Sequence, residues 1–443
     1  MIRFDRPRPA PGIVHLGCGA FHRAHQAWFT QRALDREPGP WGIVAVNLRG
    51  RAVPDALNAQ GCLYTVTARG PAGARDEVVG AIVEALYAPA GPARVIARLA
   101  DAATKIVTLT VTEKGYSHVP ATGDLDATHP DIVHDLAAPD APRSAIGLLV
   151  AGLAEIRRRG QRPPALVSCD NLPGNGRVLA ELVRQFAALR DPDLSRWVEA
   201  NVRFPATMVD RIVPATTEAD RAALLARTGY ADRACVVAED FAQWVVEDWD
   251  GPRPAWAAAG VQFVSDVAPF ERAKLRLLNG AHSMLAYRGL LAGHATVADA
   301  MADATLARAA RALMDEAAAT LAPVPGLDIH AYAEALCARF RNPGMRHRLI
   351  QIAMDGSQKL PQRLLGTIAD SLAAGRPCPE AFAAVAAWIA FARREGAGLQ
   401  DPLAPALAAA RGLDGFLAVE AVFGRDLPRD PRFRDGLARF VLE

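Results

Sequence analysis

The start of the chain constrains its fold most, because a short apolar segment leads directly into two closely spaced glycines and then into a helical pattern. Residues 13–16 predict a buried strand, Gly17-Cys-Gly19 predicts a tight turn, and residues 20–34 place apolar side chains at helical spacing. A further apolar run at 41–48 predicts a second strand. One helix between two strands, joined by short loops, forms a β-α-β unit whose strands run parallel.

The same alternation continues through the N-terminal part of the chain. Strands are predicted at 106–111 and 165–168, and helices at 144–158 and 176–189, which favours a mostly parallel sheet covered on both faces. The sequence therefore predicts an α/β Rossmann-type domain over residues 1–268, followed by an all-α domain over residues 269–443. The helical periodicity of that second domain lies in segments 272–292, 296–321, 328–340, 343–354, 361–374 and 379–394.

Composition excludes several classes of protein. The 443 residues suffice for two domains, and 50 basic against 48 acidic residues leave a formal net charge of +2, which indicates neither nucleic acid nor a membrane as partner. The six cysteines are scattered without a C-x-x-C pair, so neither a metal cluster nor a disulfide framework is predicted. The N-terminus lacks an apolar signal core, and no apolar run reaches the roughly 18 residues of a spanning helix. We expect a cytoplasmic protein acting on a small molecule, in an oligomeric state that the sequence does not indicate.

The glycines after the first strand suit a dinucleotide. Gly17 permits the tight turn, and Gly19 lets the backbone approach a pyrophosphate at the start of the following helix. The third position of the usual G-x-G-x-x-G pattern is His22, so a plain turn is the alternative. The predicted cofactor residues are Gly17, Gly19, Phe21, Arg23 and Asn47.

The end of the second strand leaves the choice of cofactor open. An NAD site usually carries Asp or Glu here for the adenosine ribose, but Val46-Asn47-Leu48-Arg49 contains neither. Arg49 and Arg51 could instead receive the 2′-phosphate of NADP, or be ordinary surface residues.

The segment Lys274-Leu-Arg-Leu-Leu-Asn279-Gly-Ala-His282 places three polar side chains on an otherwise apolar helix. At about 100° per residue, the three polar groups lie within an arc of about 140°. Burying them is costly unless they meet each other or a ligand. A desolvated lysine loses its proton more readily, which makes Lys274 a candidate general base. The alternative for each residue alone is a solvated or structural polar group.

Three other segments supply candidate partners. Asn171 lies after a predicted strand, where its amide could donate to an oxygen on the reacting carbon, although an Asn/Pro/Gly turn is the alternative. Asp210 could orient a substrate or form a surface ion pair with Arg211. Glu113, which follows the strand beginning at Ile106, could serve a proton route or face solvent.

These segments together resemble the polyol-specific long-chain dehydrogenase/reductase (mannitol dehydrogenase) family. The similarity includes Gly17 to His25, Thr110 to Tyr116, Ser168 to Gly176, Met208 to Ile212 and Lys274 to His282, in order along the chain. Within the family, Asn342 to Arg363 is most similar to fructuronate reductases (D-mannonate oxidoreductases).

The resemblance implies a metal-independent NAD-dependent dehydrogenase or reductase that acts on a secondary alcohol, with NADP not excluded. It implies that Lys274 is the general acid/base, that Asn171 and Asn279 bind the oxyanion, and that His282 and Asp210 orient the substrate. It further implies that Glu113 and Glu271 lie near the proton route.

The substrate predicted first is a sugar acid, the fructuronate/mannonate pair, whose carboxylate requires a cationic partner. The candidates are Arg348, His347, Lys359 and Arg363, each of which could instead be a surface charge. A mannitol, arabinitol or sorbitol 2-dehydrogenase is the alternative within the same class. A non-catalytic dinucleotide sensor is the alternative from another class.

Overall fold

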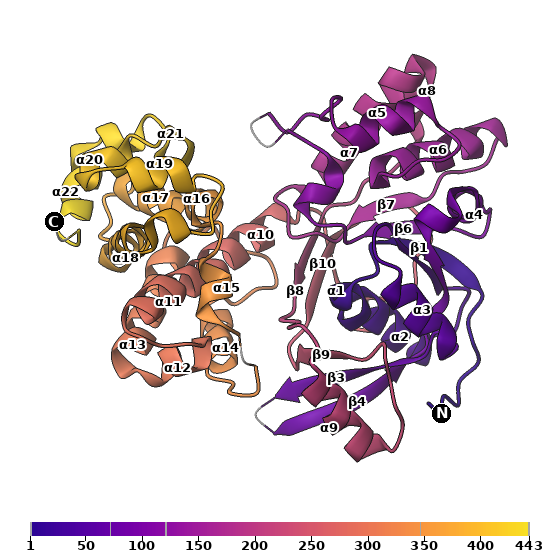
Figure 1. Ribbon diagram of the computed structural model, residues 1–443, viewed down its shortest axis with the longest axis horizontal. Coiled ribbons are helices and arrows are strands. Elements are labelled where there is room, and N and C mark those ends of the chain that lie inside the picture. Colours follow the sequence, from indigo (N-terminus) through magenta and orange to yellow (C-terminus); the bar gives the residue numbers. More distant parts are fainter. Residues whose placement is uncertain (1, 71, 120–121, 346, 442–443) are drawn as a thin grey trace. The chain divides into compact units, whose positions relative to one another are not determined.

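The computed structural model describes residues 2–70, 72–119, 122–345 and 347–441. The chain forms two compact units, an N-terminal unit that ends at Val267 and a C-terminal unit that begins at Ala268. The named strands of the described residues all belong to the N-terminal unit, and the C-terminal unit is helical (Figure 1). This arrangement confirms the predicted fold class.

The N-terminal unit is built on a five-stranded parallel sheet with the order β5-β2-β1-β6-β7. Most residues of these strands are buried, because helices cover both faces, and this explains why the strands read as continuous apolar runs. The chain moves outward from β1 in one direction and then returns to begin again on its other side. The strands are β1 (Pro11–Leu16), β2 (Gly42–Asn47), β5 (Ile82–Tyr87), β6 (Ile106–Leu109) and β7 (Ala165–Ser168).

Successive side chains of β1 enter two different cores. Ile13 packs in the core that contains Trp28 and Phe29, whereas Val14 and Leu16 pack in the core on the opposite face. The first core is covered by α1 (Ala20–Ala24), α2 (Gln26–Arg36) and α3 (Ala52–Ala59). The second is covered by α4 (Pro92–Leu99), α5 (Pro130–Ala137), α6 (Ala145–Arg158), α7 (Asn175–Arg190) and α8 (Pro192–Asn201).

Two small sheets accompany the main one, and the sequence did not indicate them. The first has the order β4-β3-β9 and the second the order β11-β10-β8. Strands β8, β9, β10 and β11 have only three to five residues, and β3 pairs with β9 from a distant part of the chain, so no local pattern indicates the pairing. The strands are β3 (Tyr64–Gly70), β4 (Gly73–Val79), β8 (Thr207–Asp210), β9 (Val236–Glu239), β10 (Gln243–Glu247) and β11 (Gln262–Val264).

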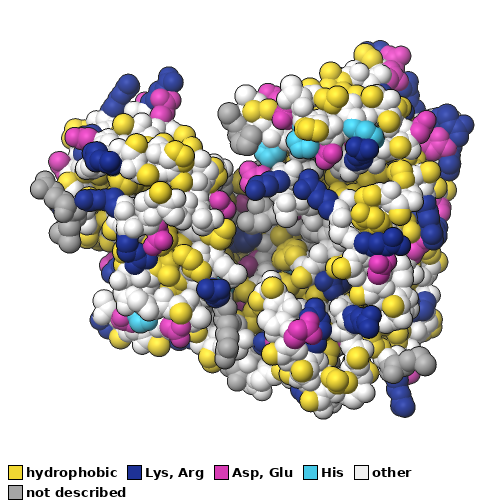
Figure 2. All heavy atoms as spheres, viewed as in Figure 1, with side chains coloured by type: hydrophobic (Ala, Val, Ile, Leu, Met, Phe, Trp, Pro, Cys, Tyr) yellow, Lys and Arg dark blue, Asp and Glu magenta, His cyan; other side chains and the backbone are white. Residues whose placement is uncertain are grey.

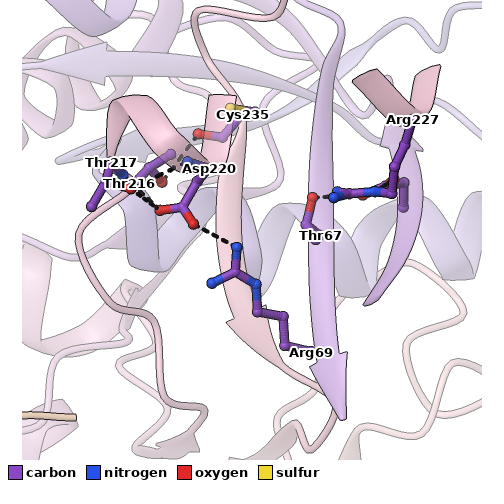
Figure 3. A network of polar contacts seen from close by, with 8 residues as sticks. Thr67, Arg69, Thr216, Thr217, Asp220, Arg227 and Cys235 are labelled. Atoms are coloured by element: carbon purple, nitrogen blue, oxygen red, sulfur yellow. Dashed lines mark hydrogen bonds and ion pairs between the residues drawn. The ribbon is translucent and has the colours of Figure 1, made fainter. Parts of the chain in front are cut away.

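Helix α9 (Glu218–Thr228) is fastened to the β3–β4 hairpin by two arginines (Figure 3). Arg227 donates two hydrogen bonds to Asp76, at 2.8 and 2.9 Å, and Asp76 also accepts from Thr67 at 2.6 Å. Arg69 pairs with Asp220 in the first turn of the helix at 2.5 Å. The bidentate geometry fixes both partners more firmly than a single contact would.

The C-terminal unit packs its helices around α11 (Gly280–Leu291), which contacts α13, α15 and α18. The predicted helix 296–321 is two helices, because Asp303 interrupts it and caps the second by accepting from the backbone N–H groups of Thr305 and Leu306. The predicted helix 343–354 is only α15 (Leu349–Ala353). The other helices are α10 (Ala268–Lys274), α12 (Val297–Ala302), α13 (Ala304–Ala318), α14 (Ile329–Phe340), α16 (Gly356–Leu360), α17 (Gly366–Ala373), α18 (Pro379–Glu395), α19 (Ala404–Ala409), α20 (Gly412–Leu417), α21 (Glu420–Phe423) and α22 (Pro431–Ala438).

Charges of both signs are interspersed over the visible face of the protein, as its nearly balanced composition leads one to expect (Figure 2). Among the helices that the structure describes, none has the length and apolarity needed to cross a bilayer.

Candidate active site

The turn after β1 has a backbone that only glycine accommodates easily. Gly17 has φ +93°, and a Cβ atom on it would lie 2.2 Å from the carbonyl oxygen of Thr110. A Cβ atom on Gly19 would meet only the Gly17 oxygen, at 3.9 Å. Gly19 precedes the first turn of α1 without a capping side chain, so that side of the loop is open. The loop lies where the strand order reverses between β1 and β6, the usual ligand position in such sheets.

A cavity of about 220 Å³ adjoins this loop and is lined by Gly17, Gly19, residues 47–50 and the start of the loop after β6. Asn47 ends β2, and its side-chain oxygen Oδ1 is buried without a hydrogen-bond partner among the described residues. A buried acceptor at this position fits a ribose hydroxyl, which can donate to it. Arg51 pairs with Asp55 at 3.2 Å, and Arg49 is exposed. The loop and the acceptor therefore fit a dinucleotide.

A buried histidine holds the Gly17 carbonyl in place from within the sheet. His15 Nδ1 lies 2.8 Å from Thr108 Oγ1, and His15 Nε2 lies 2.9 Å from Thr110 Oγ1. Thr110 Oγ1 donates to the Gly17 oxygen at 2.8 Å, so this hydroxyl accepts from His15 and the ring carries its proton on Nε2. Burial lowers the pKa of His15 to about 3, which keeps the ring neutral. His15 and Thr110 were not singled out by the sequence analysis, because a histidine within an apolar strand gives no local sign of its partner.

Phe21 and Arg23 support the turn from the protein side. Phe21 stacks on His25 with ring centroids 4.9 Å apart. Arg23 is buried, and its guanidinium donates to the oxygen of Gly19 at 3.2 Å and to the oxygen of Ala234. These contacts fix the loop. Direct contact of Phe21 and Arg23 with the cofactor stays a prediction.

The loops after β6 and β7 are joined through one buried carboxylate. Asp170 accepts from the N–H groups of Val111 and Thr112 at 3.1 and 2.8 Å, and from the hydroxyl of Tyr116 at 2.8 Å. Burial raises the pKa of Asp170, whereas these hydrogen bonds oppose the shift. Thr112 has φ +65°, a strained conformation that the Asp170 contact maintains. Asp170 and Tyr116 thus set the shape of this edge of the site, a role that only the fold reveals.

In the N-terminal unit, each residue predicted to assist Lys274 lies at the end of a strand or in the loop that follows one. Asn171 is exposed directly after Asp170. Asp210 is the last residue of β8 and is only 5% exposed, which rules out the surface ion pair considered from the sequence. Arg211 is buried too, and donates to the oxygens of Glu239 and Ala24. Glu113 is exposed, with a carboxylate oxygen 3.9 Å from His118 Nε2.

The buried side chain of Asn175 joins β8 to the loop that follows β7. Its side chain accepts from the N–H of Thr207 at 2.9 Å and donates to the oxygens of Thr207 and Asp170 at 2.8 and 3.0 Å. A fully paired buried amide of this kind stabilises one geometry. The conspicuous Asn/Pro/Gly turn is therefore partly structural.

In the C-terminal unit, Lys274, Asn279 and His282 are 7%, 9% and 5% exposed, so all three polar side chains are buried as the sequence analysis required. Residues Leu275–Asn279 form a π-helical turn between α10 and α11. A π-helical turn closes between residues five apart, so Lys274 and Asn279 come to the same side of the helix. The arc of about 140° expected for a uniform α-helix is therefore too wide.

Three polar atoms of the π-helical turn and α11 are buried without a hydrogen-bond partner among the described residues, namely Asn279 Oδ1, His282 Nε2 and the hydroxyl oxygen of Tyr287. His282 stacks on Phe340 at 4.3 Å and meets the ring of His347 at 5.3 Å. Burial, followed by the charges of neighbouring basic groups, lowers the pKa of His282 well below its usual value. Unpaired buried polar atoms are costly, so their recurrence on one helix indicates a ligand.

The remaining predicted residues surround this helix unequally. Glu271 lies one turn before Lys274 and is half-buried. His347 is half-buried, and its Nδ1 atom is buried without a partner among the described residues. Arg348 is exposed at the start of α15. Lys359 is half-buried on α16, where it donates to the oxygen of Ile352 at 3.2 Å.

The site residues thus fall into two sets. One set, at the carboxyl edge of the N-terminal sheet and on β8, is suited to a dinucleotide and hydrogen-bond donors; the other, around α11, is suited to proton transfer and substrate binding. In the part of the chain that the structure describes, no three His, Cys, Asp or Glu side chains are grouped to hold a metal ion.

Comparison with known proteins gives matches along nearly the whole chain. The family model of the mannitol dehydrogenase Rossmann domain matches residues 11–258, and that of the mannitol dehydrogenase C-terminal domain matches residues 266–441. The uncharacterized oxidoreductase YeiQ of Escherichia coli (strain K12) is 44% identical over 97% of this chain and 91% of its own length. The D-mannonate oxidoreductase of the same strain is 43% identical over 97% of this chain and 92% of its own length.

Solved structures agree with these matches. The mannitol 2-dehydrogenase of Pseudomonas fluorescens, in a ternary complex with NAD and D-mannitol, is 38% identical and superimposes with a TM-score of 0.86. The match covers 98% of this chain and 91% of that one.

Proposed function

This chain belongs to the mannitol dehydrogenase family of oxidoreductases, and we propose that it uses NAD(H) to interconvert a secondary alcohol of a sugar acid and its ketone, with fructuronate and mannonate as the pair. The observation that carries the proposal is the buried Lys274–Asn279–His282 group with its unpaired polar atoms. A protein that only senses a dinucleotide would have no use for a buried lysine and unpaired polar atoms on one helix. The similarity to a D-mannonate oxidoreductase supports the choice of a sugar acid.

The bound nicotinamide supplies or accepts a hydride. Lys274 gives a proton to the substrate oxygen during reduction and removes it during oxidation. The second role requires a neutral amine, which burial of the side chain favours. Asn171 and Asn279 donate to the same oxygen as negative charge develops, a placement worth about 3 kcal/mol for each donor.

The other predicted residues orient the substrate and connect the site to solvent for proton transfer. Asp210 and the neutral ring of His282 hold the substrate hydroxyls, and Glu113 and Glu271 lead the proton to solvent. His347, Arg348 and Lys359 are the predicted contacts for the remainder of the substrate.

A polyol 2-dehydrogenase is the second candidate, because the ternary complex of the Pseudomonas fluorescens relative contains D-mannitol. Its site would need groups that read hydroxyls instead of a carboxylate.

A steady-state panel tests the proposal. NADH oxidation is measured with fructuronate and with fructose, and NAD reduction with mannonate, mannitol, arabinitol and sorbitol, each repeated with the NADP pair. We expect the highest kcat/KM for the hexuronate and hexonate with NAD(H). A preference for fructose and mannitol would establish the polyol enzyme, and a lack of turnover with every substrate would favour the sensor.

A further inference from the structure

Arg363 is a cation without an acidic partner beside the helix that carries Lys274. Its guanidinium donates to Ser283 Oγ at 3.2 Å, and no carboxylate of the described residues lies within 4 Å of it. Burial lowers the pKa of Arg363 to about 10, and the residue as a whole is half-buried. A partly desolvated guanidinium is stabilised when an anion supplies the missing charge and two acceptor atoms.

Another cation, Lys359, lies close enough to Arg363 for the two charges to interact, and the buried hydroxyl of Tyr287 is a further titratable neighbour of Arg363. Lys359 donates to main-chain oxygens, those of Ile352 and Met354, and not to a carboxylate. Burial, with the charge of Arg363 as the next cause, lowers the pKa of Lys359 to about 8. Two cations that destabilise each other are kept together at a cost, which a shared anion would remove.

Two carboxylates, those of Asp355 and Asp401, act on Lys359 and partly oppose the lowering of its pKa, but among the described residues neither forms an ion pair with Lys359 or Arg363. Asp401 accepts from the N–H and the hydroxyl of Ser357 at 2.8 and 2.5 Å, and from the N–H of Leu403 at 2.8 Å. Asp355 is exposed before α16. Burial lowers the pKa values of His282 and His347, so their rings are neutral and add no charge to this region.

Backbone contacts hold Arg363 close to the predicted catalytic helix. Residues Pro361–Leu365 form a second π-helical turn, and a Cβ atom on Gly280 would lie 3.0 Å from the Arg363 carbonyl oxygen. Gly280 directly follows Asn279, and Ser283, the partner of the guanidinium, directly follows His282. Both π-helical turns therefore present polar side chains to one region of the C-terminal unit, as such turns often do at functional sites.

We propose that Arg363, with Lys359 beside it, anchors the carboxylate of the substrate and thereby makes the site selective for a sugar acid. The inference rests on the proposed function and deepens it. Arginine offers a planar fork that matches a carboxylate, and lysine adds a point charge. Arg348, the other arginine among the candidates from the sequence, is exposed at the start of α15.

Three variants test the anchor. Arg363→Met removes the charge and keeps the volume, Arg363→Lys keeps the charge without the fork, and Arg308→Met is the matched control on α13, where Arg308 is exposed. NADH binding, followed by fluorescence, shows that each variant is folded. For each we measure kcat and KM with fructuronate and with fructose, and calorimetric binding of mannonate and mannitol.

We expect Arg363→Met to raise the fructuronate KM and the mannonate Kd by about 10- to 100-fold, with fructose and mannitol changed less than about threefold. Arg363→Lys should recover part of the loss, and Arg308→Met should match the parent. Equal losses for the acid and the neutral sugar, or an unchanged fructuronate KM, would overturn the anchor while leaving the proposed reaction intact. If the parent protein turns over neither sugar, a mannonate affinity that depends on Arg363 still supports the anchor, and one that does not refutes it.

Discussion

At the scale of single residues, the buried polar side chains carry the functional argument. Lys274 and His282 lie on a helix whose other neighbours are mostly apolar, and His15 lies within the central strand of a sheet. Each is costly to bury, and each is predicted to serve either the cofactor loop or the proton transfer. The two roles are separable by experiment because one concerns cofactor binding and the other concerns turnover.

Lys274→Ala should lower kcat by about 100- to 10,000-fold, because the proton donor and acceptor of the reaction is lost. The dissociation constant for NADH, measured by fluorescence titration, should stay within about threefold. A variant that keeps its kcat would remove Lys274 from the mechanism.

His15→Ala should weaken NADH binding. The Thr110 hydroxyl then no longer accepts a hydrogen bond from His15, and this bond orients its proton toward the Gly17 carbonyl oxygen. One neutral hydrogen bond of this kind is worth about 1 kcal/mol, or roughly a fivefold change in the dissociation constant. Calorimetry with NADH measures the effect directly. His15→Gln, which can retain an N–H donor, should lose less, and identical behaviour of the two variants would argue against the relay.

At the scale of secondary-structure elements, the two functional helices differ from the pattern read in the sequence. The predicted helix 272–292 contains the π-helical turn Leu275–Asn279, and the predicted helix 361–374 begins with another, Pro361–Leu365. Proline has no N–H to donate, which suits an irregular start. The glycine turn before α1, in contrast, has the geometry that its two glycines require.

The two glycines of that turn should respond differently to alanine. Gly17→Ala forces a Cβ atom to within 2.2 Å of the Thr110 oxygen at φ +93°, so we expect a clearly lower melting temperature. Gly19→Ala has open space and a φ of −89°, so its melting temperature should change little. NADH affinity should still fall, because the added methyl group occupies the space reserved for the pyrophosphate. Circular dichroism and fluorescence titration separate the two effects, and a Gly19→Ala protein with unchanged affinity would place the pyrophosphate elsewhere.

At the scale of the whole molecule, buried neutral histidines make stability depend on pH. His15, His22 and His282 have pKa values lowered chiefly by burial, whereas in the unfolded chain they titrate near the ordinary value of about 6.5. Below that pH the unfolded state binds more protons than the folded state, so the free energy of unfolding decreases as the pH falls. The stability that each neutral ring contributes is complete above pH 6.5. It is lost progressively as the pH falls toward the pKa of the folded state, which is about 3 for His15.

Between pH 7.5 and pH 5, each such histidine should lower the free energy of unfolding by about 2 kcal/mol. Thermal unfolding should therefore show a melting temperature that falls over this range. His282→Gln should reduce the slope. A melting temperature that is constant over this range would mean that these rings are not held neutral.

The family resemblance read from the sequence is confirmed by the matches to both mannitol dehydrogenase domains. Some features could be predicted because they depend on residues that are neighbours along the chain. These are the parallel sheet from the alternation of apolar strands and helices, the turn from Gly17 and Gly19, and the polar group of Lys274, Asn279 and His282. Local spacing suffices for these, because strand and helix periods are properties of short segments.

Other features depend on partners that are distant along the chain, and these are visible only once the chain is folded. The pairing of β3 with β9, the His15–Thr110–Gly17 relay and the π-helical turns arise from contacts between segments that no local pattern connects. Arg363 was one of several basic candidates in the sequence, and its lack of an acidic partner became visible only when the surrounding helices were in place. The sequence shows which side chains can carry a charge, whereas packing sets the desolvation and pairing that give each charge its function.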